Sequence, residues 1–344
     1  MNELLDQLIP VVTRIMLLGG ATFVIAMALT PIYTYFAYKY KFWKRQKSVA
    51  LDGKKLTVIN KLHAAKIARR VPTMAGMIFV LAIAITTLFF NLSRPQTWLP
   101  LAALIGGAIV GLIDDILNLR SNGGVAGLRA PVKFTMVAFL GLVLGWFFWY
   151  KLGFTAVHVP FAGEWDLGIF MVPLFAFVVI AAGSAVNISD GLDGLAGGLA
   201  ASAFTMFAVI ALLGEQFGLA GFCLTIVGAL LAYLWFNIYP ARFFMGDVGS
   251  FALGVSLGVV AMLTNCLFIL PIIGAVFVIE TGSVIIQQLS KKLRHGKKIW
   301  PATPIHHTFE AKGWPETKVT MRFWVLGNVA GIVGIIVALA GGNV

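Results

Sequence analysis

Five of the eight aspartates in this sequence fall in three short segments that separate apolar runs. Asp114 and Asp115 lie in GLIDDILNLRSNG, Asp190 and Asp193 in NISDGLDGLAGG, and Asp247 in FFMGDVGSFALG. Carboxylates near lysine and arginine suit Mg²⁺, which proteins hold with one or two carboxylates, phosphate oxygens and water. Metal and cations together would neutralise a diphosphate during phosphoryl transfer. The pattern therefore favours a phosphoryl-transfer site over chance loop composition.

A second polar group lies in TPIHHTFEAKGWPE, where His306 and His307 adjoin each other. Adjacent histidines do not share a helical face, so their spacing is weak evidence for a metal site. They are better suited to donate hydrogen bonds to phosphate or another polar substrate. Taken alone, the segment fits an exposed pair without function equally well.

The glycines of DGLDGLAGG have two interpretations. Gly191 and Gly194 lie beside aspartates and would let the backbone approach a ligand closely. Gly197 and Gly198 instead indicate close helix packing, because small residues let membrane helices approach each other.

Long apolar runs must position these segments. The 344 residues are 59% hydrophobic and only 12% charged, and the mean hydropathy is +0.91, which is typical of an integral membrane protein. We expect an all-α membrane protein that forms one domain over residues 1–344. About ten runs are long enough to cross a bilayer as helices: 15–38, 74–92, 97–113, 132–150, 168–186, 195–213, 219–237, 248–265, 267–289 and 321–341.

Lysine and arginine predict the orientation of these helices, because both accumulate in cytoplasmic loops. The loop after the first helix, residues 39–70, contains eleven of them and is expected inside. With ten crossings, the segments 114–131, 187–194, 238–247 and 290–320 fall on the same side, and both termini lie outside. The carboxylates and histidines would then face the cytoplasm. No basic stretch interleaved with aromatic residues predicts binding to nucleic acid.

Five motifs carry a resemblance to a known family: PTMAG at 72–76, GLIDD at 111–115, NISDGLDGLAGG at 187–198, WFNIYPARFFMGDVGS at 235–250 and TPIHHTFEAKGWPE at 303–316. Their order and spacing resemble those of the polyprenyl-phosphate N-acetylhexosamine-1-phosphate transferases. The resemblance covers nearly the whole chain. Its FFMGDVGS and histidine elements are specific, whereas a double aspartate alone would be weak.

Within that family the chain resembles the branch that uses UDP-N-acetylmuramoyl-pentapeptide. The resemblance implies that this donor and undecaprenyl phosphate give lipid I of peptidoglycan synthesis and UMP, with Mg²⁺ required. It also implies a multi-pass protein of the bacterial inner membrane with ten helices, the ninth broken, and a cytoplasmic active-site cleft. It further implies a homodimer.

The resemblance also assigns roles to single residues. Asp247 and Asn187 would be the Mg²⁺ ligands, and Asp114 would orient or deprotonate the lipid phosphate. Direct attack and a covalent intermediate on Asp247 both stay open. The implied catalytic residues are Asp114, Asp115, Asp247, His306 and His307. The implied substrate-binding residues are Lys133 near the diphosphate, Asn187, Asp190 in support of the polar centre, Leu192, Asp193, Asn237 and Phe244 at the uridine end, and Gln287.

Two positions depart from the family pattern. Thr308 stands where the family commonly has a third histidine, and it cannot supply a cation there. Ala75 replaces one glycine of the PTMAG segment, which is expected to affect backbone freedom rather than chemistry.

Two alternatives use the same residues differently. A relative that transfers from UDP-N-acetylglucosamine or another UDP-sugar would keep the metal chemistry, although the HHTFEAKGWPE segment favours the muramoyl branch. A secondary transporter would place ionisable groups near the middle of the bilayer. Glu280, alone inside the ninth apolar run, is the residue that favours a transporter; otherwise we expect it to hydrogen-bond across helices.

Overall fold

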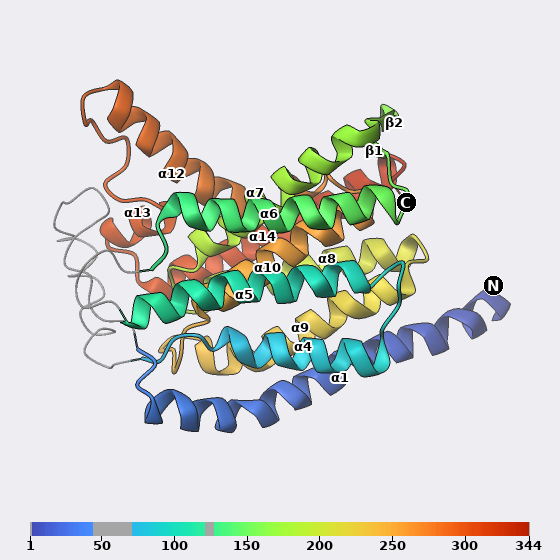
Figure 1. The fold of residues 1–344 in the computed structure, drawn as a ribbon, viewed down its shortest axis with the longest axis horizontal. Coiled ribbons are helices and arrows are strands. Elements are labelled where there is room, and N and C mark those ends of the chain that lie inside the picture. The colour runs from blue at the N-terminus through green and yellow to red at the C-terminus, as the bar shows by residue number, and fades with distance from the viewer. Residues whose placement is uncertain (1, 44–70, 121–126, 344) are drawn as a thin grey trace.

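The computed structural model describes residues 2–43, 71–120 and 127–343. Most of the basic loop that predicts the orientation, including Lys44 and Arg45, lies outside the described residues. The described part of the chain is helical apart from one short hairpin (Figure 1). Its long helices are α1 Asn2–Lys39, α4 Gly76–Phe90, α5 Trp98–Arg120, α6 Ala130–Tyr150, α7 Met171–Ser189, α8 Leu195–Leu213, α9 Phe217–Asn237, α10 Gly246–Leu263, α12 Ala275–Leu293 and α14 Glu316–Ala340.

Eight helices in the described ranges are long and apolar enough to cross a membrane: α1, α5, α6, α7, α8, α9, α10 and α14. The other two long helices differ in length and polarity. Helix α4 is apolar but has only 15 residues, and α12 ends in a polar, basic turn with Lys291 and Lys292. The structure is therefore that of an integral membrane protein.

Helix α10 forms the centre of the bundle. Every residue from Val248 to Leu263 is buried, because α4, α5, α7 and α8 pack around it. Glycines permit the closest of these approaches: Gly254 lies against the backbone of α7, and Gly107 of α5 lies against the backbone of Phe251. In membrane helices, such small residues allow the backbones to come together.

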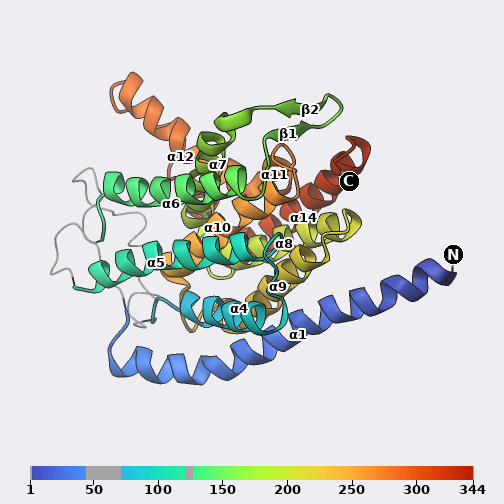
Figure 2. The same cartoon turned by 45° about the vertical axis from the view of Figure 1, so that its right-hand side comes forward.

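Both ends of the chain lie at one end of the bundle, as two views show (Figures 1 and 2). The opposite end gathers the end of α5, the start of α6 and the short helix α13, Ile305–Ala311. The last turns of α12 project from the bundle at that same end in both views. The predicted site segments therefore share one end of the molecule.

The sequence prediction was wrong for some boundaries. Asp114 and Asp115 lie inside α5 rather than in the loop after it, because the helix continues past the apolar run with both carboxylates buried. The histidines lie on α13 rather than in an irregular loop. The predicted run 267–289 is interrupted at Gly274, between α11, Leu270–Ile273, and α12. Its place as a broken ninth membrane helix stays a prediction.

An antiparallel hairpin between α6 and α7 was not predicted. Strands β1, Ala156–Val159, and β2, Gly163–Asp166, pair with Ala156 opposite Asp166. Contacts with the segment after α10 and with the end of the chain hold it. The backbone N–H of His158 donates to Asn265 Oδ1 at 3.0 Å, and the Nε2 of His158 bonds the carbonyl oxygen of Gly341 at 2.8 Å. The hairpin lies at the end of the bundle opposite the predicted site.

Candidate active site

Three charged side chains meet where α5 ends and α6 begins. Lys133, in the first turn of α6, donates to Asp114 Oδ2 at 3.0 Å and to Asp247 Oδ2 at 2.6 Å. Asp114 also accepts from Asn118 Nδ2 at 3.0 Å and from the backbone N–H of Leu128 at 2.6 Å. The Asp114 side chain is 4% exposed, whereas those of Lys133 and Asp247 are 22% and 16% exposed. The ammonium can bind phosphate, and the carboxylates can bind a hard cation.

The second aspartate of the pair has a different neighbour. Asp115 is fully buried, and its Oδ2 accepts the backbone N–H of Val248 at 3.0 Å in the first turn of α10. A carboxylate is favourable there because helix N-termini carry unpaired N–H groups and positive dipole charge. One turn earlier in α5, a Cβ on Gly111 would collide with the backbone of Asp247. Asp115 thus holds the turn that presents Asp247.

Asn187 reaches the next turn of α10 from the end of α7. Its Nδ2 donates to Ser250 Oγ at 2.9 Å, and Ser250 lies one turn after Asp247. Asp190 ends α7, and its backbone N–H donates to the Asn187 carbonyl at 3.3 Å. The Oδ1 of Asn187 is the one side-chain atom with lone pairs to offer, so it is the atom that could bind a cation.

The segment 192–194 is fixed by two other parts of the chain. Asp193 is buried, and its Oδ2 accepts the backbone N–H of Ala241 at 3.0 Å. The Asp193 N–H donates to Glu316 Oε1 at 2.6 Å, at the start of α14. Leu192 beside it is buried in the core. Asp193 therefore holds the 238–245 segment as well as being the predicted uridine contact.

Asn237, the last residue of α9, joins two segments of the predicted uridine end. It accepts the backbone N–H of Gly194 at 2.9 Å and donates Nδ2 to the carbonyl of Phe243 at 2.9 Å. Phe244, which follows Phe243, is half-buried. Its N–H and carbonyl both bond the segment 72–76, at 2.8 and 3.0 Å. The PTMAG motif thus positions the Phe244 ring through its backbone.

Ala75 fits this segment without strain. Its φ is −65°, in the right-handed helical region, which is sterically allowed for alanine. The left-handed residue of the segment is Met74, with φ of 73°. The replaced glycine is therefore not needed for backbone freedom at position 75.

The two histidines have different carboxylate partners. His306 is fully buried and its Nδ1 lies 2.9 Å from Glu280 Oε2, which is also fully buried in α12. His307 Nδ1 lies 2.7 Å from Glu310 Oε2 on the same short helix. The other side of the His306 ring touches Gly191, where a Cβ would collide with Nε2. Glu280 thus bonds across helices, as expected for a protein other than a transporter.

Thr308 and Gln287 both bond the loop before α13. The Thr308 hydroxyl donates to the carbonyl of Ala302 at 2.5 Å and is buried. Gln287 donates Nε2 to the Trp300 carbonyl at 2.8 Å and accepts the N–H of Ile299 at 2.9 Å. Both side chains therefore shape this loop, and substrate contact by Gln287 stays a prediction.

The donor set fits a metal only in part. Within the described ranges, no three His, Cys, Asp or Glu side chains surround one point. Asp247, Asp114 and Asn187 supply oxygen atoms, and an ammonium already lies between the two carboxylates. A cation such as Mg²⁺ would thus complete its shell with phosphate and water, as this ion commonly does.

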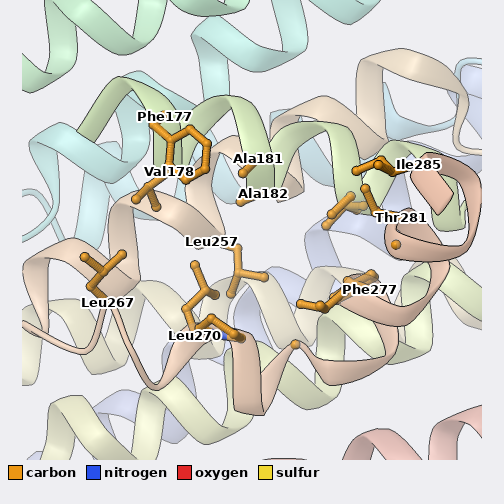
Figure 3. Close-up of a pocket in the computed structure, with 16 residues that line it drawn as sticks. Phe177, Val178, Ala181, Ala182, Leu257, Leu267, Leu270, Phe277, Thr281 and Ile285 are labelled. Carbon is orange, nitrogen blue, oxygen red and sulfur yellow. The ribbon is translucent and has the colours of Figure 1, made fainter. Parts of the chain in front are cut away.

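An apolar groove runs along the bundle beside this site (Figure 3). It encloses about 320 Å³ between α7, α10, α11 and α12, and Thr281 is its one hydroxyl side chain. Ala185 and Val186 line it immediately before Asn187, while Leu267 and Leu270 lie at the other end. The groove therefore runs along the outer surface of the helices toward the end of α7 that carries Asn187.

Several residues of the site escaped the sequence analysis. Asn118 lies four residues after Asp114, and this spacing on a helix could have indicated the pair. Glu310 and Glu316 were quoted within a motif without a role. In the structure Glu310 bonds His307, and Glu316 accepts the backbone N–H of Asp193. The predicted roles of the site residues stay predictions.

Comparison with known proteins places this membrane bundle in a class of enzymes. Residues 97–265, from α5 to just beyond α10, match the model of glycosyl transferase family 4. This range contains the Asp114, Lys133 and Asp247 cluster.

Curated relatives narrow the class. The chain is 36% identical to the phospho-N-acetylmuramoyl-pentapeptide-transferase of Chloroflexus aurantiacus, over 98% of this chain and 93% of the relative. It is 38% identical to that of Geobacillus sp., over 91% and 94%. It is 39% identical to that of Heliobacterium modesticaldum, over 78% and 84%. The chain belongs to the phospho-N-acetylmuramoyl-pentapeptide-transferase family.

Proposed function

We propose that this transferase moves phospho-N-acetylmuramoyl-pentapeptide from its UDP-linked donor to undecaprenyl phosphate, giving lipid I and UMP for peptidoglycan synthesis. Family membership supports the reaction. The observation that carries the location is the cluster in which Lys133 bonds Asp114 and Asp247. Its charges suit two phosphate-bearing substrates that meet at the end of an apolar bundle.

The reaction exchanges one phosphoanhydride bond for another. An oxygen of the lipid phosphate bonds the sugar-bound phosphorus, the bond from that phosphorus to the UMP oxygen breaks, and UMP leaves. Asp114 orients the lipid phosphate and accepts the proton of its monoprotonated form, while Lys133 neutralises charge on the diphosphate. Asp115 holds the first turn of α10. His306 and His307 donate hydrogen bonds to the UDP-linked donor. Either direct attack or a covalent intermediate on Asp247 fits these roles.

Mg²⁺ is part of the proposal, with Asp247 and Asn187 as its protein ligands. The metal would neutralise phosphate charge and align the donor. Two observations support this choice. Asp114 and Asp247 already hold one cationic group, the ammonium of Lys133. The side chains at this place also offer only oxygen atoms as metal ligands. If Asp247→Asn kept full activity across a Mg²⁺ titration, this assignment would be wrong. A Glu215→Gln variant, changed in the connection between α8 and α9, is the matched control.

The groove of Figure 3 could bind the polyprenyl chain of the lipid substrate. Its walls are apolar, so they suit an isoprenoid rather than water, and it ends beside Asn187. The lipid phosphate would then reach the charged cluster from the membrane, and the water-soluble donor would arrive from outside the bilayer.

The membrane arrangement completes the proposal. Ten crossings, with α4 and α12 added to the eight apolar helices, put both termini on the outer side and the site on the cytoplasmic face of the bacterial inner membrane. The lysines of residues 39–70 support this orientation. We further propose one domain over residues 1–344 and a homodimer, as the family resemblance implies.

Donor choice tests the function. Purified protein receives undecaprenyl phosphate, Mg²⁺ and either UDP-N-acetylmuramoyl-pentapeptide or UDP-N-acetylglucosamine, and UMP release is measured. We expect UMP with the muramoyl donor alone. UMP from the glucosamine donor alone would move the chain to the other branch, and vesicle uptake without UMP release would favour a transporter.

A further inference from the structure

We propose that Glu280 is a positioning residue, which through His306 holds the turn at residues 190–191 in place for donor binding. Its effect on catalysis rests on the proposed function. Its effect on the turn does not, because the contacts that define it are structural.

The first link is the bond between α12 and α13. Glu280 and His306 are both fully buried, with Glu280 Oε2 2.9 Å from His306 Nδ1. A carboxylate can only accept, so the hydrogen of this bond lies on Nδ1. A buried carboxylate in an apolar helix is costly and is by default a functional feature. The bond to His306, a residue of the sequence motif, compensates part of the cost of burying Glu280.

The second link is the contact between His306 and the end of α7. Gly191 leaves so little space that a Cβ would collide with Nε2 of the imidazole and lie 2.8 Å from its Cε1. Because Glu280 fixes the opposite edge, the ring cannot turn away easily. The ring therefore acts as a wedge between α12 and the turn that follows Asn187.

The third link is what this turn carries. Asn187, Asp190 and Asp193 all lie within four residues of Gly191, and they are the predicted metal and donor contacts. Loosening the wedge should weaken donor binding first. The lipid groove lies on the neighbouring residues Phe277, Val278 and Thr281 of α12 and does not depend on the carboxylate.

Three variants of Glu280 separate the effect of side-chain length from the effect of the negative charge. Glu280→Gln keeps the length of the side chain and an accepting oxygen but loses the charge. Glu280→Asp keeps the charge but is one methylene shorter, so it cannot reach Nδ1, and Glu280→Ala loses both. Ser283→Ala is the control, because Ser283 is buried one turn later and its hydroxyl bonds only the backbone carbonyl of residue 280 among the described residues.

Two measurements test the wedge. In hydrogen–deuterium exchange, the peptide covering 187–194 should exchange at least about fivefold faster in Glu280→Ala and Glu280→Asp, and as in the wild type in Glu280→Gln and Ser283→Ala. In UMP-release kinetics, KM for the UDP donor should rise about tenfold in the first two variants, the size of one lost hydrogen bond to a charged group. KM for undecaprenyl phosphate should stay within about twofold.

The contrary results are equally definite. An active Glu280→Asp beside an inactive Glu280→Gln would show that charge matters rather than reach, and would overturn the proposal. Unchanged exchange of 187–194 in folded Glu280→Ala would also overturn it. If the wild type released no UMP, the proposed function would fail, while the exchange data would still decide the role of Glu280.

Discussion

Removing the ammonium of Lys133 should have two opposite effects. Lys133→Met keeps the length of the side chain but leaves Asp114 and Asp247 without their shared partner. Their oxygens lie 3.0 and 2.6 Å from one nitrogen. They are thus no more than about 6 Å apart, a separation at which two charges interact by about 3 kcal/mol at an effective dielectric constant of 20. A divalent cation bound there would gain from two carboxylates whose charges the ammonium no longer offsets, and from the loss of a neighbouring positive charge.

We therefore expect Lys133→Met to need less Mg²⁺ for half-maximal activity, by up to roughly a hundredfold, since about 3 kcal/mol corresponds to two factors of ten at 1.4 kcal/mol each. At saturating Mg²⁺, kcat should fall about 100-fold, because a preorganised donor to the developing charge is lost. The assay is a Mg²⁺ titration of UMP release in detergent. Lys151→Met, at the other end of α6, is the control and should match the wild type. An unchanged kcat, or an increased Mg²⁺ requirement, would refute the reasoning.

Three further substitutions and one control test the packing around the site. Gly111→Ala should push against the backbone of Asp247, cost about 1–3 kcal/mol and lower UMP release. Gly20→Ala, where the added methyl meets open space in α1, should change neither stability nor activity. Thr308→His should lose rather than gain activity, because the hydroxyl it replaces is buried and bonded within its loop; a strong gain in UMP release would contradict this. Ala75→Gly should lower the free energy of unfolding in detergent by about 0.4–1 kcal/mol, because glycine gives the unfolded chain more freedom, whereas a stabilised protein would indicate backbone strain at this position.

Hydropathy predicted the helices well where side chains face lipid or an apolar core. It failed at the end of α5, because helical hydrogen bonds do not require apolar residues and the carboxylates of Asp114 and Asp115 turn inward. It also missed the β1–β2 hairpin. Four-residue strands carry little periodic signal, and this hairpin is held by Asn265 and Gly341 from distant parts of the chain.

The sequence predicted which segments form the site, but it predicted few of the contacts between them. Topology predicted that Asp114 and Asp247 share one end of the bundle, and Lys133 now bonds both. The pairing of Glu280 with His306 could not be predicted, because it depends on how α13 folds back onto α12 across 26 residues. The ten crossings and the single domain stay predictions.

The fate of the sugar-bound phosphorus tests the central claim most directly. The donor is labelled with ³²P on the phosphorus attached to N-acetylmuramoyl-pentapeptide and incubated with the protein, undecaprenyl phosphate and Mg²⁺. After solvent extraction, the label should appear in the lipid phase, with unlabelled UMP in the aqueous phase. Label that left the donor as UDP, with only the sugar reaching the lipid, would contradict a phosphosugar transfer at this site.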